Sequence, residues 1–336
     1  MKTAVKRLAL VGAALALAGA GCAFGESSGR DRADAMVAPP DSGRGPPPPV
    51  IDAGPIDAAS ADASVFYPPE HLLVTEVMTM PFGSVSGTRA EFVEIWNPTE
   101  QTFDLSVYYL SNSKAYALLP EGDVSVESGQ DFIVNFPVGA QIRPDDVIVV
   151  AIDGEGFEEA YDQVANYAIR DPGNSTPMEI VDIGNDTLGV GFPNQGKGLM
   201  LFHWNGLTNR VDDVDMIMTG SRDDPDDVHN ILDKTGLEVD GPASGTSTYR
   251  DDAFTMGQIR GQFESNTPVG TSYKRVALEG AHIRRSGGNG ITGHDETSED
   301  IRRTWDNQQD PEGYTPPTPG EIPQSLRDAA AALRGD

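Results

Sequence analysis

The chain has 336 residues, of which 52 are acidic and 24 are basic, giving a formal net charge of −28. This charge argues against nucleic-acid binding, because neutralising phosphates requires clustered Lys and Arg, and it favours cations or basic partners. Hydrophobic residues make up 38% of the chain, which is enough for a globular core.

An export signal is predicted in residues 1–21. Basic Lys6 and Arg7 precede an apolar run from Leu8 to Ala20, which is shorter than the roughly 20 residues that a membrane-spanning helix needs. Small residues then lead to Cys22, the only cysteine of the chain. A basic start, a short apolar run and a small-residue site are together typical of a secretory signal peptide.

The segment 17–22, Leu-Ala-Gly-Ala-Gly-Cys, resembles a bacterial lipoprotein signal, although Gly19 stands where leucine is more usual. The resemblance implies that Cys22 is acylated and anchors the mature chain in a membrane. Lipoproteins kept at the inner membrane often have Asp after the cysteine, whereas this chain has Ala23. We therefore expect an outer-membrane anchor, facing the periplasm or the cell surface. A cleaved signal with an incidental cysteine is the alternative.

Residues 22–66 are predicted to form a disordered tether. The stretch is rich in Pro, Gly, Ala, Ser and Asp, and it includes four consecutive prolines at positions 46–49. It has too few large apolar residues to form a core. Proline keeps such a chain extended, at about 3 Å per residue. The tether would hold the following domain well away from a membrane surface.

From Tyr67 onward, short apolar or alternating runs separated by Gly, Asn, Pro and Asp predict β-strands. The predicted strands are Leu72–Val77, Glu91–Trp96, Val107–Leu110, Phe132–Asn135, Val147–Ile152, Leu199–Trp204, Val211–Met218 and Ser272–Leu278. Short strands with turn signals between them are typical of an antiparallel β-sandwich. We expect this all-β domain to carry long polar loop insertions near residues 155–193 and 219–267.

A helix is predicted only near the C-terminus, in a short tail at residues 321–336. Between Pro323 and Leu333, small and apolar residues recur at helical spacing, and Ser325 is placed to cap the helix. No internal repeat of solenoid length is visible.

The run from Phe92 to Asn97 predicts an interior strand, because apolar residues occupy both of its faces. One face carries Val93 and Ile95, and the other carries Phe92, Glu94 and Trp96. A buried carboxylate at Glu94 requires hydrogen-bond donors, which a loop backbone or the Asn97 side chain could supply. We therefore expect structural roles for Glu76, Glu94 and Asn97.

Several segments, in this order along the chain, resemble the lamin tail domain. They are Leu73–Val77, Glu91–Thr99, Asp104–Ser106, Ile142–Val150, Gly198–Phe202, Val211–Val214, Ser272–Arg275 and Thr318–Gly320. The resemblance places a domain at residues 67–320. It implies an immunoglobulin-like β-sandwich, as found in nuclear lamins and in many secreted or surface bacterial proteins.

Motifs for catalysis are weak in this sequence. The segment Gly83–Gly87 matches the nucleophile-elbow pattern, but no helix is predicted after it. The segment Gly288–Gly293 matches a dinucleotide fingerprint without the required βαβ unit. The five histidines lack the short spacings that place two imidazoles on one metal ion, so zinc could bind only through contacts between distant segments. We predict no catalytic residues and do not expect an enzyme.

Calcium is the cofactor that the acidic clusters suggest most directly. Asp223, Asp224, Asp226 and Asp227 lie together in the second polar stretch, and Ca²⁺ binds oxygen ligands held in irregular loops. The EF-hand pattern is absent there, however, and a solvated, solubilising loop is the favoured interpretation.

These features predict a cell-envelope lipoprotein that presents a non-catalytic binding or scaffolding module to an unknown protein or polysaccharide ligand. The alternative is a secreted or surface hydrolase whose site, with or without calcium, lies in the loop insertions. Binding to nucleic acid, known for some proteins with lamin tail domains, is disfavoured by the charge.

Overall fold

The computed structural model describes residues 70–79, 81, 87–185, 189–192, 197–219, 232–253, 270, 272–280, 282–283, 285–306 and 316–335. The chain divides into two units, Met1–Ala58 and Ala59–Asp336, and every described residue belongs to the second. The predicted signal and the whole tether, with the anchor Cys22, lie outside the described residues, as do Asp223, Asp224, Asp226 and Asp227. No helix in the described part of the chain is long and apolar enough to cross a membrane.

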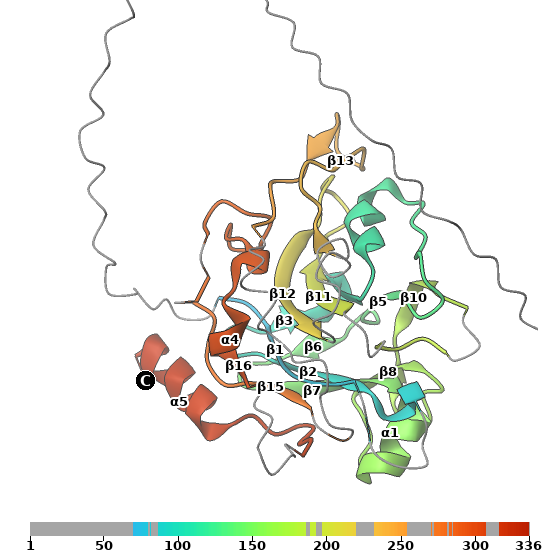
Figure 1. Ribbon diagram of the computed structural model, residues 1–336, viewed down its shortest axis with the longest axis vertical. Helices are drawn as coiled ribbons and strands as arrows, with labels where there is room; N and C mark the ends of the chain where they lie inside the picture. Colours follow the sequence, from blue (N-terminus) through green and yellow to red (C-terminus); the bar gives the residue numbers. More distant parts are fainter. Residues whose placement is uncertain are drawn as a thin grey trace, which may run out of the picture. The chain divides into compact units, whose positions relative to one another are not determined.

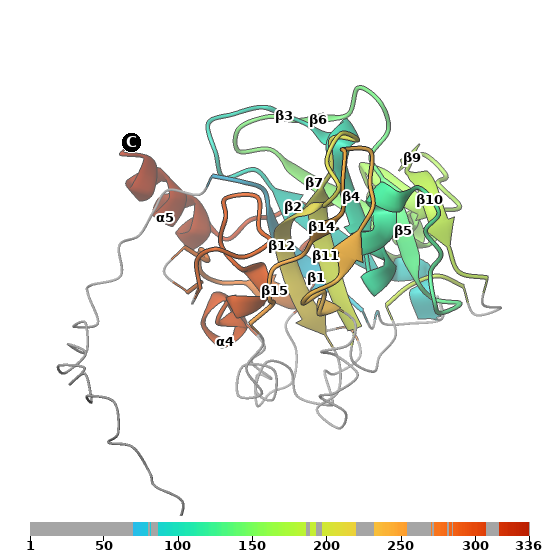
Figure 2. The ribbon, with the colours of Figure 1, turned by 90° about the horizontal axis from the view of Figure 1, so that it is seen from above.

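The second unit is an all-β sandwich of two main sheets (Figures 1 and 2). The seven-stranded sheet has the order β16 (Trp305–Asp306), β15 (Tyr273–Arg275), β1 (Leu73–Met78), β2 (Phe92–Trp96), β7 (Val147–Asp153), β8 (Tyr167–Arg170) and β9 (Thr176–Pro177). The five-stranded sheet has the order β10 (Glu179–Ile183), β5 (Phe132–Asn135), β4 (Tyr108–Ser111), β11 (Lys197–His203) and β12 (Asp212–Thr219). Two small sheets join β3 (Phe103–Asp104) to β6 (Gln141–Ile142) and β13 (Glu238–Val239) to β14 (Ser247–Thr248).

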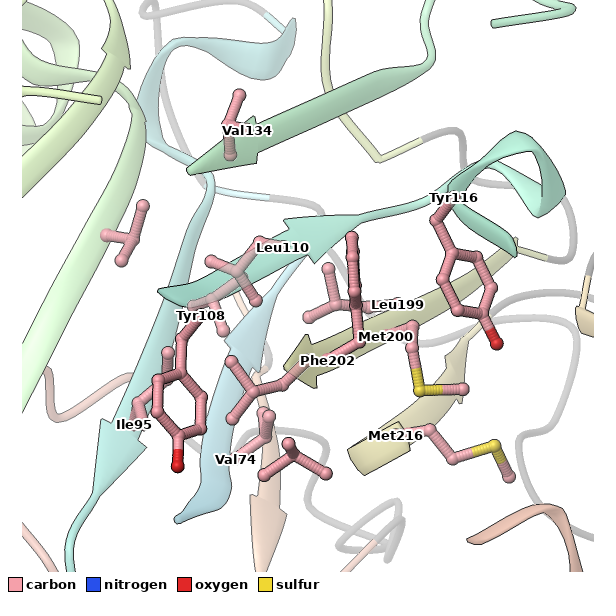
Figure 3. Close-up of a cluster of buried hydrophobic side chains, with 14 of the residues drawn as sticks. Val74, Ile95, Tyr108, Leu110, Tyr116, Val134, Leu199, Met200, Phe202 and Met216 are labelled. Atoms are coloured by element: carbon pink, nitrogen blue, oxygen red, sulfur yellow. The ribbon is translucent and has the colours of Figure 1, made fainter. Parts of the chain in front are cut away.

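Apolar side chains fill the space between the two main sheets. In Figure 3, Val74 and Ile95 of the seven-stranded sheet lie in one cluster with Leu110 and Val134 of the five-stranded sheet. Each such side chain, once fully buried, contributes about 1.5–3 kcal/mol to stability. This shared core fixes the separation and the relative orientation of the sheets.

Helices cover the outer face of the seven-stranded sheet (Figure 1). Helix α1 (Gly154–Tyr161) packs Phe157 against Phe92 of β2, with ring centroids 5.6 Å apart. Helix α5 (Gln324–Arg334) packs Leu326 into a cluster with Leu73 and Trp96. The prediction that β2 is interior with two buried faces is therefore confirmed, because β1 and β7 flank it and each of its residues is buried.

Two β-bulges alter the side-chain alternation of the strands near the interior charges. In β1 the register against β2 shifts between Val74 and Glu76, and in β12 the register against β11 shifts between Asp215 and Asp213. A bulge inserts one extra residue and so changes which face the following side chains reach. Asp213 and Asp215, two positions apart, consequently enter different environments.

The predicted apolar strands are all present, with ends shifted by a few residues. Helix α5 is also confirmed, but Ser325 is not its cap: Pro323 occupies the N-cap position without a side-chain hydrogen bond, and Ser325 lies in the first turn. At the other end, Gly335 closes the helix with a φ of 87°, a left-handed conformation that glycine adopts without steric cost.

The first predicted insertion, residues 155–193, contains regular structure. After β7, helix α1 leads into β8, which pairs in parallel with both β7 and β9, and β10 then joins β5 in the other sheet. The sandwich is antiparallel as expected apart from these two parallel pairings, but the expectation of a loop at this position was wrong. A second helix, α4 (Ile301–Thr304), also precedes α5. Short 3₁₀ helices complete the fold at η1 (Gly87–Ala90), η2 (Leu105–Val107), η3 (Lys114–Glu121) and η4 (Glu296–Ser298).

Candidate functional site: a buried cluster of carboxylates and histidines

Four segments from distant parts of the sequence bring ionisable side chains together in the interior. His71 lies just before β1, Asp215 lies in β12, and Arg275 ends β15. Glu279 follows β15, and His294, Glu296 and Glu299 lie in or beside η4. The pairing of β15 with β1 and the packing of η4 on β12 hold these segments together.

Arg275 is the fixed positive charge of this site, and its side chain is fully buried. Its guanidinium donates two hydrogen bonds to Asp215, at 2.7 and 2.8 Å, and one to Glu299 Oε1 at 2.7 Å. A further bond of 2.8 Å reaches the carbonyl oxygen of Val74, and the guanidinium lies 4.8 Å from the ring centroid of Trp305. Guanidinium suits this position because its planar donors match a carboxylate and stack on an aromatic ring.

The second part of the site, here called the His–Glu cluster, consists of His71, Glu279, His294 and Glu296. His71 Nε2 lies 2.5 Å from Glu279 Oε1, and His294 Nε2 contacts Glu296 Oε1. The two imidazole rings stack with centroids 5.5 Å apart. One nitrogen or oxygen atom from each of the four residues lies within 4.8 Å of all the others.

The outward-facing ring nitrogens of both histidines have partners of their own. His71 Nδ1 lies 2.9 Å from the carbonyl oxygen of Leu72, and His294 Nδ1 contacts the hydroxyl of Thr292. Because a carbonyl oxygen only accepts, Nδ1 of His71 must carry the proton in this bond. Both Nε2 atoms therefore face the carboxylates of the cluster.

Negative charge exceeds positive charge within the site. Asp215, Glu279, Glu296 and Glu299 provide four carboxylates, whereas Arg275 is the only permanently charged cation among them. Burial raises the pKa of Glu296 well above its usual range, and neighbouring carboxylates add to the effect. Burial opposes a charge on His71, but Glu279 and Glu296 outweigh it and raise the pKa of His71 to about 9.

Two carboxylate oxygens of the cluster have no hydrogen-bond partner among the described residues: Glu279 Oε2 and Glu296 Oε2. Their side chains belong to residues that are 5% and 0% exposed. An unpaired buried oxygen of this kind is costly, by about 1–3 kcal/mol or more for a charged group. The site thus contains two buried carboxylate oxygens without a hydrogen-bond donor among the described residues.

A separate buried ion cluster lies on the other side of β12. Lys234 Nζ lies 2.5 Å from Asp213 Oδ2 and 3.1 Å from Asp252 Oδ1, and Tyr116 donates a bond of 2.9 Å to Asp213. All three charged side chains are buried. Every one of these charged groups has a partner, so this cluster serves to hold the residues around 234–252 onto β12 and η3.

Of the predicted motif residues, Glu76 and Glu94 face each other on the outer face of the seven-stranded sheet. Glu76 accepts hydrogen bonds from the hydroxyl of Ser272 and, at 3.1 Å, from the backbone amide of Thr318. Glu94 accepts from Gly320 N and from Thr75 Oγ1, both at 2.7 Å.

Asn97 does not contact Glu94. It closes the turn after β2 instead, where its amide nitrogen donates to the carbonyl oxygen of Gln101 at 2.7 Å. Its Oδ1 accepts from the backbone amide and the hydroxyl of Thr99. The three residues therefore do not form one site.

The segment Gly288–Gly293, noted for its glycine pattern, is a loop rather than part of a βαβ unit. It lines a cleft of about 200 Å³ together with Arg210, Asp212 and Arg250. Of the nucleophile-elbow pattern, only Gly87 belongs to the described residues, and it begins η1.

Sequence reasoning missed the His–Glu cluster because no local spacing marks it. His71 is separated from the other three residues by nearly the whole domain, and the β1–β15 pairing together with the packing of η4 on β12 brings them together. The one available signal was compositional: histidine is scarce in this chain, and two of its five copies meet here.

Comparison with known proteins gives little further information. No family model and no curated protein matches the chain. It is similar to a crystal structure of a DUF4876 family protein from Bacteroides thetaiotaomicron, at 13% identity and a TM-score of 0.38, with 77% of this chain and 75% of that chain covered. A similarity this low transfers neither fold nor activity. The resemblance to lamin tail domains stays a prediction.

Proposed function

We propose that the chain is a cell-envelope lipoprotein, anchored through Cys22, which presents a non-catalytic, lamin-tail-like binding or scaffolding module. The signal-like start, the single cysteine at its end and the proline-rich segment that follows support the anchor and the tether. The residue after the cysteine favours the outer membrane, facing the periplasm or the cell surface. The ligand would be a protein or a polysaccharide rather than a nucleic acid, given the net charge.

The observation that supports a binding role is a pair of exposed apolar loop tips at one end of the five-stranded sheet. Val138 is 86% exposed and Leu207 is 72% exposed. Their loops follow β5 and β11, whose ends, Asn135 and His203, align with the start of β4. The cleft beside Arg210 opens at the beginning of β12, which follows the same hairpin loop. Loops at the end of a rigid sandwich are a common place for recognition.

The binding role can be tested by site-specific cross-linking in intact cells. A photoreactive residue at Leu207 should give a discrete adduct, and the same residue at Val164, which is 51% exposed but lies after α1, should not. The double substitution Val138→Asp and Leu207→Asp should abolish binding of the partner identified in this way. Equal labelling from both positions, or binding unaffected by the double substitution, would contradict the proposal.

The anchor requires a separate test. Mass spectrometry of the mature N-terminus should show an acylated Cys22. The Cys22→Ala variant should carry no acyl group at its N-terminus. An unmodified Cys22 would refute the anchor without affecting the binding test.

A further inference from the structure

The His–Glu cluster presents the donor set of a metal site. His71 and His294 offer two imidazole nitrogens, and Glu279 and Glu296 offer carboxylate oxygens, all within 4.8 Å of one another. An ion bound at about 2.0–2.2 Å from each donor would need only small side-chain rotations to contact all four. The donors come from three segments that the sheet pairing already holds in place.

The outer contacts of the histidines are those of metal ligands. Metal-bound imidazoles almost always donate their second ring N–H to a carbonyl, carboxylate or water, which fixes the tautomer. His71 does so to the carbonyl oxygen of Leu72 at 2.9 Å, and His294 Nδ1 contacts Thr292 Oγ1. Its other ring nitrogen, Nε2, lies 2.5 Å from Glu279 Oε1. A nitrogen and a carboxylate oxygen this close require a proton or a metal cation between them.

The unpartnered carboxylate oxygens give independent support. Glu279 Oε2 and Glu296 Oε2 accept no hydrogen bond among the described residues, although both residues are more than nine-tenths buried. Arg275 is occupied by Asp215, Glu299 and the Val74 carbonyl. A divalent cation would offer these carboxylates a partner and add positive charge to a site where four carboxylates surround one guanidinium.

We propose that His71, Glu279, His294 and Glu296 bind one zinc ion in a closed structural site. Two imidazoles with two carboxylates suit a first-row transition metal, whereas calcium takes six to eight oxygen ligands. Four protein ligands with little exposure, the most exposed side chain being His294 at 16%, leave no open position of the kind that catalysis needs. The ion would fasten the residue before β1 to the loops after β15. The inference is independent of the lipoprotein and binding roles proposed above.

Metal content of the full chain provides the first test. The chain, purified in detergent, stripped with chelator and re-equilibrated with Zn²⁺ in excess Ca²⁺ and Mg²⁺, should retain one zinc ion per chain after gel filtration. X-ray absorption at the zinc edge should show two imidazole ligands and no sulfur. Zn²⁺ should raise the melting temperature relative to chelator, since a ligand that binds only the folded state stabilises it, and Ca²⁺ should not.

Variants separate this site from adventitious binding to the acidic surface. His294→Ala and Glu296→Gln should each weaken zinc binding by about 100-fold or more and remove the rise in melting temperature. His203→Ala is the matched control, because His203 ends β11 beside Asp212 and lies outside the cluster. Zinc in amounts well below one ion per chain, a spectrum without imidazole, or unchanged binding in both cluster variants would overturn the proposal. Because the spectrum is recorded on the wild-type chain, the test stands even if a variant fails to fold.

Discussion

At the residue scale, buried charges are arranged around two cations, Arg275 and Lys234. Each cation contacts two carboxylates inside the protein, Asp215 and Glu299 in one case and Asp213 and Asp252 in the other. Removing one partner from such a group typically costs about 3–5 kcal/mol, because the remaining charge is left buried and unpaired. These residues therefore hold together elements that are far apart in the sequence.

Glu94 should make the stability of the protein depend on pH. Burial raises the pKa of Glu94 to about 8, with the facing Glu76 adding to the effect and the hydroxyl of Thr75 opposing it. The folded state thus holds a proton that the unfolded state releases above pH of about 4.3. Stability is therefore greatest below that pH and is lost as pH rises toward 8, by at most about 1.4 kcal/mol per pH unit for one proton.

Urea unfolding between pH 5 and pH 8 measures this contribution. Glu94→Gln should flatten the decline in stability with rising pH, whereas Glu159→Gln on the exposed side of α1 should keep the wild-type slope. An unchanged slope in Glu94→Gln would show that the proton resides elsewhere.

At the scale of the elements, the sequence identified those strands whose apolar residues face a core. Val93 and Ile95 alternate in β2 as predicted because both side chains face the core between the two sheets. Strand β10 escaped prediction because Ile180 and Val181 are both exposed at a sheet edge, so no alternation is required there. The bulge that separates Asp213 from Asp215 could not be predicted from the sequence either, because it depends on the register of β12 against β11.

Helix α1 escaped prediction because two glycines lie in its first turn. A Cβ atom has no room at either glycine: at Gly154 it would lie 2.4 Å from the carbonyl oxygen of Pro172, and at Gly156 it would lie 2.1 Å from that of Arg89. Gly156→Ala should therefore destabilise the protein by about 1–3 kcal/mol through overpacking, although alanine is the better helix former. Thermal unfolding monitored by circular dichroism would measure this loss. Glu159→Ala in the same helix should change stability by no more than about 0.5 kcal/mol, and an equal effect of both substitutions would refute the clash.

At the scale of the whole molecule, the last part of the folded unit completes its first strands. Strand β15 pairs with β1, the Thr318–Gly320 segment binds Glu76 and Glu94, and α5 covers Leu73 and Trp96. Sequence reasoning found the sandwich but could not find the His–Glu cluster, because local patterns carry no information about contacts between segments so far apart.

Ending the chain at residue 315 should therefore weaken the entire sandwich. The deletion removes the backbone donors that Thr318 and Gly320 provide to Glu76 and Glu94, and it exposes the apolar surface beneath α5. A single large-to-small change such as Leu326→Ala already costs about 2–5 kcal/mol, so the deletion should lower the urea midpoint by more than that substitution does. A chain ending at Gly335, which keeps the residue that closes α5, is the control and should unfold like the full chain. Equal midpoints for the chains ending at 315 and at Gly335 would show that the tail is dispensable.

The bond between Glu76 and Thr318 joins residues 242 positions apart, which sets the timing of folding. A chain that emerges from a ribosome or an export channel N-terminus first exposes β1 long before β15 and Thr318 arrive. Until then β1 has an unpaired edge, the kind of surface that promotes aggregation. This edge of β1 can therefore be covered only after nearly the whole domain has been released.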